Sequence, residues 1–228
     1  MYCRYCGGVC VKDGLQGNKV QRYKCKECHR RQQSDYRYKA YDMDVDRQIV
    51  VLTREGVSIR GLARCIGISC TTVLARIKKI AAEIHAPSVN VGSEYEVDEM
   101  WTFLKNKHKP LWIAYALDRN SKEVISFNVG GRSIDMMTPV LDVVKEADPK
   151  KVYTDYLVHY LSLVPSHIHV RGKCGTNHIE RHNLNMRTHL KRLSRKTICF
   201  TRSVDMLVSI LKIYFWGVKV YFPHFRKG

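Results

Sequence analysis

Residues 93–104, SEYEVDEMWTFL, mark the point at which the sequence changes from helical periodicity to alternation. In an extended strand, one side of this segment carries mainly aromatic and aliphatic side chains, namely Tyr95, Val97, Trp101 and Phe103. The other side carries two acids, in the set Glu96, Asp98, Met100 and Thr102. The alternation therefore predicts a β-strand with an apolar face and an acid-bearing face.

The sequence that follows this strand predicts a mixed α/β domain. The segments PLWIAYALDR (residues 110–119) and KEVISFNVGG (122–131) are expected to form a hairpin about Asn120 and Ser121. We expect a helix from Asp135 to Glu146, a short strand in KKVYTD (150–155) and another in HIHV (167–170). Three early strands are thus followed by a helix, a strand and a helix.

Three acids occupy positions from which a metal site is commonly built. Asp98 lies within the first strand, Asp155 at the end of the fourth and Glu180 on a later helix, and sites in α/β folds gather at strand ends. Clustered carboxylates repel one another unless a cation lies between them, and their hard oxygens suit Mg²⁺ or Mn²⁺. From spacing alone, these acids could instead cap helices or pair with arginine. Four other acids are also available as metal ligands, namely Glu96, Glu99, Asp118 and Asp142.

Residues 177–196, NHIERHNLNMRTHLKRLSRK, form a basic helical segment with one carboxylate, Glu180. At about 100° per residue, Arg187 lies within about 20° of Glu180, and Leu184 and Lys191 lie within about 40°. A buried stripe is expected beside them, at Ile179, Met186, Leu190 and Leu193. Three histidines fall on the face opposite Glu180 and are interpreted as surface or packing residues, namely His178, His182 and His189.

The N-terminal segment contains two CxxC pairs, CRYC and CKEC, separated by 18 residues. Two such turns complete a tetrahedral four-thiolate zinc site, with the ligands Cys3, Cys6, Cys25 and Cys28. A structural zinc ribbon is therefore predicted, with a short strand over 21–24; buried or redox-active cysteines are the alternative. Cys10 and His29 are not expected to be ligands.

Residues 44–84 predict a helix-turn-helix. A first helix begins near Asp44 and ends at Gly56, Ser58 caps a second helix, Gly67 makes the turn, and Ser69 caps a third. An ordinary three-helix unit with no DNA role is the alternative. If the third helix enters the major groove, the candidates for DNA contact are Thr71, Thr72, Arg76, Lys78 and Lys79.

Charge is unevenly distributed along the 228 residues. Lys and Arg number 39 against 21 Asp and Glu, a formal charge of +18 that favours a polyanionic partner, with nucleic acid before an anionic membrane surface. Residues 1–40 carry +7, 41–170 are neutral, and 171–228 carry +11. With residues 32–42 read as a linker, we expect a zinc ribbon at 1–40, a helix-turn-helix domain at 41–90 and an α/β domain at 91–228.

No segment has the roughly 18 uninterrupted apolar residues of a membrane span, and no signal peptide follows Met1. We therefore expect a soluble, intracellular protein. Its nine cysteines are not expected to form a disulfide framework.

Several motifs in order resemble the transposases of the insertion sequence 1 family, in their fused full-length form. These motifs are VDEMWTFL (97–104), VYTDYL (152–157), IERHNLNMRTHLKRLSRK (179–196) and FTRSVDM (200–206), behind the CxxC pairs and the helix-turn-helix. The resemblance implies a DDE transposase with an RNase H-like catalytic domain, which cuts at terminal inverted repeats and joins 3′-OH ends to target DNA with Mg²⁺ or Mn²⁺. It implies a metal-binding triad of Asp98, Asp155 and Glu180, with Arg187 as an accompanying basic residue. After Asp155, YLVHYL departs from the Gly and Trp of familiar members.

The resemblance also implies a mechanism and partners. Attack is in line, first by water and then by the freed 3′-OH, without a covalent enzyme intermediate. The partner is double-stranded DNA, held by at least a dimer because two element ends must be joined, in a prokaryotic-type cytoplasm at the nucleoid. Phosphate contacts are expected from Lys173, Arg187, Lys191, Arg192, Arg195 and Lys196.

Two further functions stay open on the sequence. One is a repressor made of ribbon and helix-turn-helix with an inactive catalytic domain; the other is an RNase H-type nuclease that acts on RNA hybrids. Residues 200–222 are expected to form a closing helix in the core and then an extended end, and Cys174 and Cys199 are interpreted as packing residues.

Overall fold

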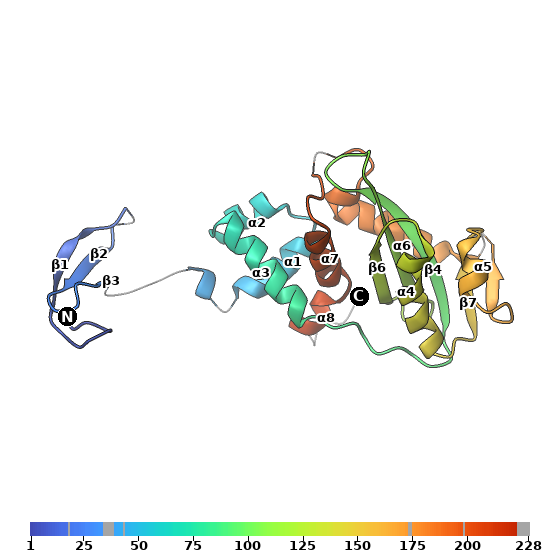
Figure 1. Cartoon of the computed structure of the whole chain (residues 1–228), viewed down its shortest axis with the longest axis horizontal. Helices are drawn as coiled ribbons and strands as arrows, with labels where there is room; N and C mark the ends of the chain where they lie inside the picture. The colour runs from blue at the N-terminus through green and yellow to red at the C-terminus, as the bar shows by residue number, and fades with distance from the viewer. Residues whose placement is uncertain (18, 34–38, 43, 173–174, 198, 223–228) are drawn as a thin grey trace. The chain divides into compact units, whose positions relative to one another are not determined.

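The computed structural model describes residues 1–17, 19–33, 39–42, 44–172, 175–197 and 199–222 (Figure 1). It divides into two compact units, 1–42 and 43–228. Part of the expected linker, the expected phosphate contact Lys173, the expected packing residue Cys174 and the chain after residue 222 lie outside the described residues. The boundary expected near residue 90 stays a prediction.

The first unit is a small antiparallel sheet beside the cysteines. Its strands, in the order β1-β2-β3, are β1 (Cys10–Leu15), β2 (Gln21–Cys25) and β3 (Arg31–Gln33), followed by a short 3₁₀ turn, η1 (Lys39–Tyr41). The strand expected over 21–24 is confirmed as β2. Gln32 accepts from the backbone N–H of Arg4 (2.8 Å) and donates to the carbonyl of Tyr2 (2.8 Å), so β3 is tied to the first CxxC turn. Cysteine residues form most of the buried cluster of this unit. A core this small needs an additional cross-link to be stable.

Three helices open the second unit, at the expected positions: α1 (Val45–Arg54), α2 (Ile59–Ile66) and α3 (Cys70–Glu83). Ser58 accepts from the N–H of Gly61 at the start of α2, and Ser69 accepts from the N–H of Thr72 at the start of α3. Gly67 adopts φ 77°, the left-handed conformation that the turn requires. The two predicted caps and the predicted turn are confirmed.

A five-stranded mixed sheet follows in the order β6-β5-β4-β7-β8, and it confirms the predicted α/β class. The strands are β4 (Glu94–Phe103), β5 (Pro110–Asp118), β6 (Val124–Gly130), β7 (Lys151–Thr154) and β8 (His169–Arg171). The first three are antiparallel, whereas β7 and β8 run parallel to β4. In the register of the sheet, Asp98 on β4 is paired with Tyr115 on β5, and Tyr95 on β4 is paired with Val152 on β7.

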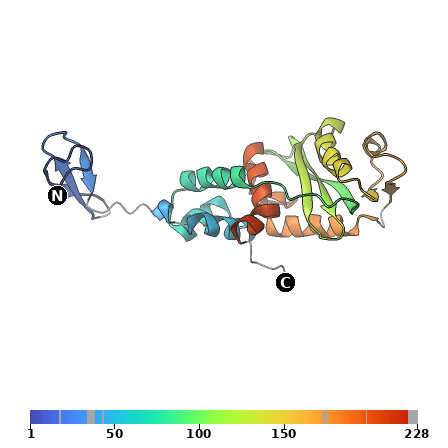
Figure 2. The ribbon, with the colours of Figure 1, turned by 90° about the horizontal axis from the view of Figure 1, so that it is seen from below.

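Helices cover both faces of the sheet. In Figure 2, α4 (Ile134–Glu146) lies on one face and the orange helix α6 (Asn177–His189) lies on the other. The α4 face buries Tyr95 and Val97 against Val140, while α6 buries Ile179 and Met186. Because both sides are covered, most side chains of β4 are buried, and the expected alternation separates two interior faces. The short helix α5 (His159–Leu163) follows β7, and the 3₁₀ turn η3 (Lys191–Leu193) follows α6.

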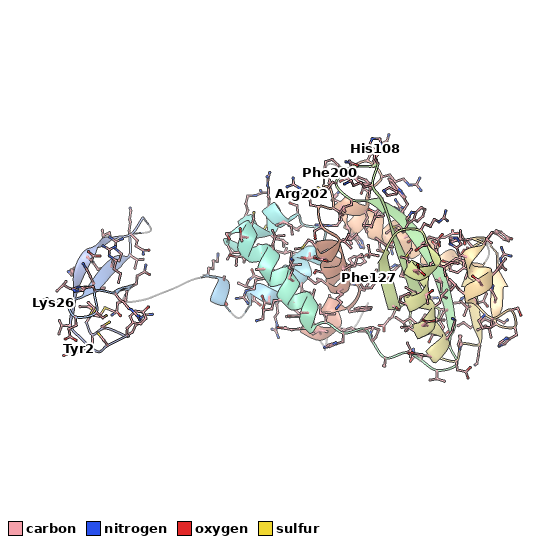
Figure 3. All side chains as sticks on the ribbon, in the orientation of Figure 1. Tyr2, Lys26, His108, Phe127, Phe200 and Arg202 are labelled. Carbon is pink, nitrogen blue, oxygen red and sulfur yellow. The ribbon has the colours of Figure 1, made fainter. Side chains whose placement is uncertain are left out.

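The C-terminal helices join the three-helix segment to the sheet. They are α7 (Val204–Lys212), the π-helical turn η4 (Ile213–Gly217) and α8 (Val218–Tyr221). Lys212 donates to the carbonyls of Ala81 (3.4 Å) and Ile84 (3.5 Å), while the indole of Trp216 donates to the carbonyl of Val124 on β6 (2.6 Å). Phe127, labelled in Figure 3, packs its ring against Trp216, with centroids 5.3 Å apart. The expected closing helix in the core is confirmed, but the extended end expected after it is wrong, because the helical backbone continues through η4 and α8 to Tyr221.

The segment before α7 runs along the β4–β5 hairpin, where Figure 3 labels His108, Phe200 and Arg202. The N–H of Lys105 donates to the carbonyl of Thr201 (2.7 Å). Cys199 is exposed here, so its interpretation as a packing residue is wrong; it lies in an irregular stretch that the helical pattern does not describe. Among the described residues, no helix is both long and apolar enough to cross a membrane.

Gly56, in the turn between α1 and α2, packs closely against the end of α6. Its φ is 74°, and an added Cβ would lie 1.8 Å from the carbonyl oxygen of His189. We expect Gly56→Ala to lower the free energy of unfolding by about 2 kcal/mol or more, because alanine adds backbone strain and a clash with a backbone atom. Urea unfolding measures this. The matched control is Gly131→Ala, where an added Cβ has no described atom within 4 Å; equal stability of the two variants would contradict the packing.

Candidate active site

Three carboxylates converge where β7 ends beside the middle of β4. The pairing of β4 with β7 stops at Glu96 and Tyr153, so Asp98 and Glu99 lie beyond the end of β7. Asp155 is the first residue after that strand. One oxygen from each of Asp98, Glu99 and Asp155 lies within 4.8 Å of the other two. The structure thus brings two of the expected acids together and adds Glu99.

Local hydrogen bonds orient the two aspartates. Asp155 Oδ1 accepts from the N–H of Leu157 (2.9 Å), which fixes the carboxylate over the turn after β7. Asp98 Oδ2 accepts from Asn183 Nδ2 (2.7 Å), so one turn of α6 lies directly against the group. Asn183 therefore belongs to the site, although no pattern in the sequence predicts a role for it.

Glu99 enters the group from the opposite face of β4. Its Oε1 accepts from Arg132 Nη2 (2.6 Å), and its Oε2 accepts from the hydroxyl of Tyr160 (2.7 Å). The guanidinium of Arg132 stacks 4.4 Å from the ring centre of Trp112. The side chain of Glu99 is only 1% exposed, so these donors offset the cost of burying its charge.

Burial and neighbouring charge alter the ionisation of Asp98. Desolvation and the charge of Glu99 raise the pKa of Asp98 from 3.8 to about 7, against a smaller lowering by the hydrogen bond from Asn183. Without a cation, the carboxyl group of Asp98 is therefore partly protonated near neutral pH. A divalent ion between the carboxylates would favour its ionised form.

The remaining expected acid, Glu180, lies outside the close group of described carboxylates. It is exposed in the first turn of α6 and accepts from the hydroxyl of Thr176 (3.3 Å). At about 100° per residue, Glu180 lies about 60° from Asn183, on the flank of α6 that meets Asp98.

Arg187 is on the same flank, is half-buried and bonds to backbone carbonyls. Its guanidinium donates to the carbonyls of Leu193 (3.4 Å) and Trp101 (3.4 Å), so it joins α6 to β4. Burial lowers the pKa of Arg187, partly opposed by the charge of Asp98.

The other rival acids have structural partners. Glu96 accepts from His178 Nδ1 (2.6 Å) and from the N–H of Ile179 (2.8 Å), and Arg119 lies 3.2 Å away. Asp118 accepts two backbone N–H bonds in the β5–β6 turn, and Asp142 pairs with Lys145. The histidines of α6 pack as expected, with His182 3.3 Å and His189 2.8 Å from the hydroxyls of Tyr115 and Tyr214.

The four expected thiols of the first unit also converge. One Sγ atom from each of Cys3, Cys6, Cys25 and Cys28 lies within 4.8 Å of the others, with Cys3–Cys28 and Cys6–Cys25 both 3.5 Å apart. The N–H of Tyr5 points at Cys3 Sγ (3.4 Å) and lowers the pKa of that thiol. Tetrahedral zinc with Zn–S bonds near 2.3 Å separates its sulfurs by about 3.8 Å. The donor set and its spacing therefore fit one zinc ion.

The expected DNA-contact residues differ in their surroundings. Thr71, Lys78 and Lys79 are exposed on α3, whereas Thr72 bonds Ser69 and Arg76 pairs with Asp46 (3.2 Å). On the segment after α6, three cations are exposed, namely Lys191, Arg195 and Lys196. Arg192 is half-buried there, and its burial lowers its pKa.

The mixed sheet and the acids at the end of β7 place the chain among α/β proteins whose site is built at strand ends. A family model described as IS1 transposase matches residues 93–222, and the chain belongs to the IS1 transposase family. The resemblance expected from the motifs is confirmed.

Relatives agree with this family. Insertion element iso-IS1n protein InsB of Shigella dysenteriae is 36% identical over 111 residues, which cover 49% of this chain and 85% of that protein. Insertion element IS1 2 protein InsB of Escherichia coli K12 is 32% identical over 141 residues, which cover 60% of this chain and 84% of that protein. Among solved structures, a chain in the simian T-cell lymphotropic virus intasome with PP2A regulatory subunit B56 gamma matches with TM-score 0.39 and 14% identity, over 72% of this chain and 66% of that chain.

The raised pKa of Asp98 predicts a pH-dependent effect of Asp98→Asn on the metal-free protein. A raised carboxyl pKa gives stability that is present below pH 4 and lost as the pH rises to about 7. The variant has no ionisable group at this position and does not lose this stability as the pH rises. Its Tm should therefore exceed that of the wild type by roughly 5 °C at pH 8 and by much less at pH 4.5. Thermal unfolding at both values, with Asp142→Asn as an exposed control, tests it. A Tm difference that does not grow with pH would count against a buried, acid-flanked Asp98.

Proposed function

We propose that this chain is a DDE transposase, which binds the terminal inverted repeats of an insertion element, cuts there and joins the 3′-OH ends to target DNA. The observation that carries the proposal is the convergence of Asp98 and Asp155 at the end of β7 in a member of a transposase family. Three antiparallel strands followed by two parallel ones, with helices on both faces, support an RNase H-like catalytic domain.

The carboxylates fit a Mg²⁺ or Mn²⁺ site because their oxygen atoms lie close together and are partly shielded from solvent. Bound divalent metal supplies Lewis-acid activation of the attacking oxygen and stabilisation of the leaving oxygen. Asp98 and Asp155 would hold the ion, and Asn183 orients Asp98. Glu180 would complete the set from the facing flank of α6 by exchanging its bond to Thr176 for the metal.

Arg187 contributes by position. Its bond to the carbonyl of Trp101 holds α6 against β4, so the spacing between Asp98 and the Glu180 turn is fixed. Its positive charge near Asp98 favours the ionised carboxylate that a metal requires.

The basic N-terminal part is proposed to recognise the element ends. A zinc ribbon at 1–40 would contact phosphates, and a helix-turn-helix domain at 41–90 would present the exposed start of α3 to the major groove. The catalytic domain would then be 91–228. Joining two ends requires at least a dimer on DNA, and the proposed setting is the nucleoid of a prokaryotic-type cytoplasm.

No specific feature favours the rival functions. An inactive repressor has no need to keep buried acids together, since their repulsion costs stability. An RNase H-type nuclease for RNA hybrids has no need of a major-groove reader.

Strand transfer tests the proposal, with labelled element-end DNA, a plasmid target and Mg²⁺. Asp155→Asn and Glu180→Gln should each reduce joined product by about a hundredfold or more, equivalent to about 2.7 kcal/mol of transition-state stabilisation. Asp142→Asn, an exposed acid on α4, is the matched control and should retain activity. Specific DNA binding by the wild type without cleavage in Mg²⁺ or Mn²⁺ would favour the repressor instead.

The same assay separates two candidate third acids. Glu99→Gln keeps the hydrogen bond from Arg132 and should reduce product less than Glu180→Gln if Glu180 is the metal ligand. The reverse order would assign the role to Glu99.

Metal analysis tests the zinc site. The purified protein should contain about one zinc per chain, and Cys25→Ser should lose it, because three thiolates bind zinc less tightly than four. Cys65→Ser removes an exposed thiol of α2 and should keep the metal. Zinc retained by Cys25→Ser, or absent from the wild type, would exclude this ligand set.

A further inference from the structure

A groove of about 270 Å³ lies between α6 and the β5–β6 hairpin. Leu117 supplies an apolar part of its wall. The hairpin contributes one polar side chain and α6 contributes five: Lys122, Asn177, His178, Arg181, His182 and Asn185. The groove is distinct from the acidic group, which contains none of these residues.

The charges that border the groove suit an anion. The surface within it is mainly apolar, and the polar residues around it supply two permanent cations, two imidazoles and two amides; among the described residues no carboxylate borders it. Ammonium and guanidinium groups are obligatory donors, and amides also donate. Lys122 and Arg181 are both exposed, and Lys122 Nζ donates to the carbonyl of Arg119, which leaves two of its three donors for a ligand.

The nearest acid stands behind the wall. Glu96 is fully buried, and its charge is taken up by Arg119 (3.2 Å) and by His178 Nδ1 (2.6 Å). The bond to Glu96 fixes the His178 ring, whose side chain is 41% exposed, at the groove. Glu123, the neighbour of Lys122 in the chain, pairs with Lys219.

The groove lies on the flank of α6 away from the acids. At about 100° per residue, Arg181 and Asn185 lie roughly 100° and 140° from Glu180, whereas Arg187 lies about 20° from it. The buried stripe of Ile179 and Met186 separates the two flanks on the sheet side. One helix therefore has an acidic site along one flank and a basic groove along the other.

We propose that this groove binds backbone phosphates of double-stranded DNA, in a segment other than the one at the acidic group. The inference rests on the proposed function, in which the protein must hold more than one stretch of DNA. Phosphate oxygens are matched by the donors of the wall, and Arg and Lys are the usual partners of the DNA backbone. The +11 charge of residues 171–228 draws DNA to this part of the chain.

Salt-dependent DNA binding by the full-length protein tests the groove. The double variant Lys122→Ala/Arg181→Ala removes two cations from it, and Lys145→Ala/Lys150→Ala removes two exposed cations from α4 and the loop after it, with an equal change in net charge. The dissociation constant for a duplex is measured between 50 and 300 mM salt. The groove variant should lower the slope of log Kd against log salt by about 1.8, at 0.9 per lost phosphate contact, whereas the control should leave it unchanged.

A second variant keeps the shape of the groove. Asn185→Asp places a carboxylate in the wall at nearly constant volume and should weaken duplex binding about fivefold at low salt by repelling phosphate. Circular dichroism confirms that each variant is folded.

The outcomes separate the two proposals. Wild-type binding with unchanged slope and affinity in the groove variants overturns the groove while the transposase proposal stands. No duplex binding by the wild type overturns both. A change in molecular mass by light scattering, with an unchanged salt slope, would show that the groove holds an acidic surface of a second copy, which also overturns the DNA assignment.

Discussion

The early end of β7 is the constraint on which the candidate site depends. Because that strand stops at Thr154, β4 is paired only with β5 at Asp98 and Glu99, and side chains from both faces of β4 reach the gap on its β7 side. Three carboxylates there repel one another. Asn183 holds Asp98, Arg132 and Tyr160 hold Glu99, and the N–H of Leu157 holds Asp155. The proposed divalent cation would offset the repulsion among these like charges.

The helix α6 relates this site to the rest of the second unit. Its buried stripe packs on the sheet, one flank meets Asp98 through Asn183, and the other flank forms the wall of the basic groove. Near its start, the N–H of Ile179 donates to Glu96, and its last residue, His189, packs against Gly56 and Tyr214, so the helix is held at both ends. A single rigid element thus carries acid, core and donor functions on separate faces.

Periodicity predicted most elements because helices and strands bury regular stripes, and the caps at Ser58 and Ser69 follow from local chemistry. Asp98 and Asp155 were suggested by their places on strands, but Glu99 remained one rival among several. Alternation assigns adjacent residues to opposite faces, and only the three-dimensional strand end lets both reach one gap. The role of Asn183 could not be predicted for a related reason, since its partner Asp98 lies 85 residues away in the chain. Cys199 was misassigned because no periodic pattern covers its irregular segment.

The position of α7 has a consequence for synthesis. The side chains of Val50 on α1 and Ile84 after α3 approach Gly217, and Lys212 binds the carbonyls at the end of α3. The three N-terminal helices therefore lack part of their packing until the ribosome has translated almost the whole chain, although domains generally begin to fold in order of synthesis. A prematurely terminated product would carry these helices with an uncovered apolar face.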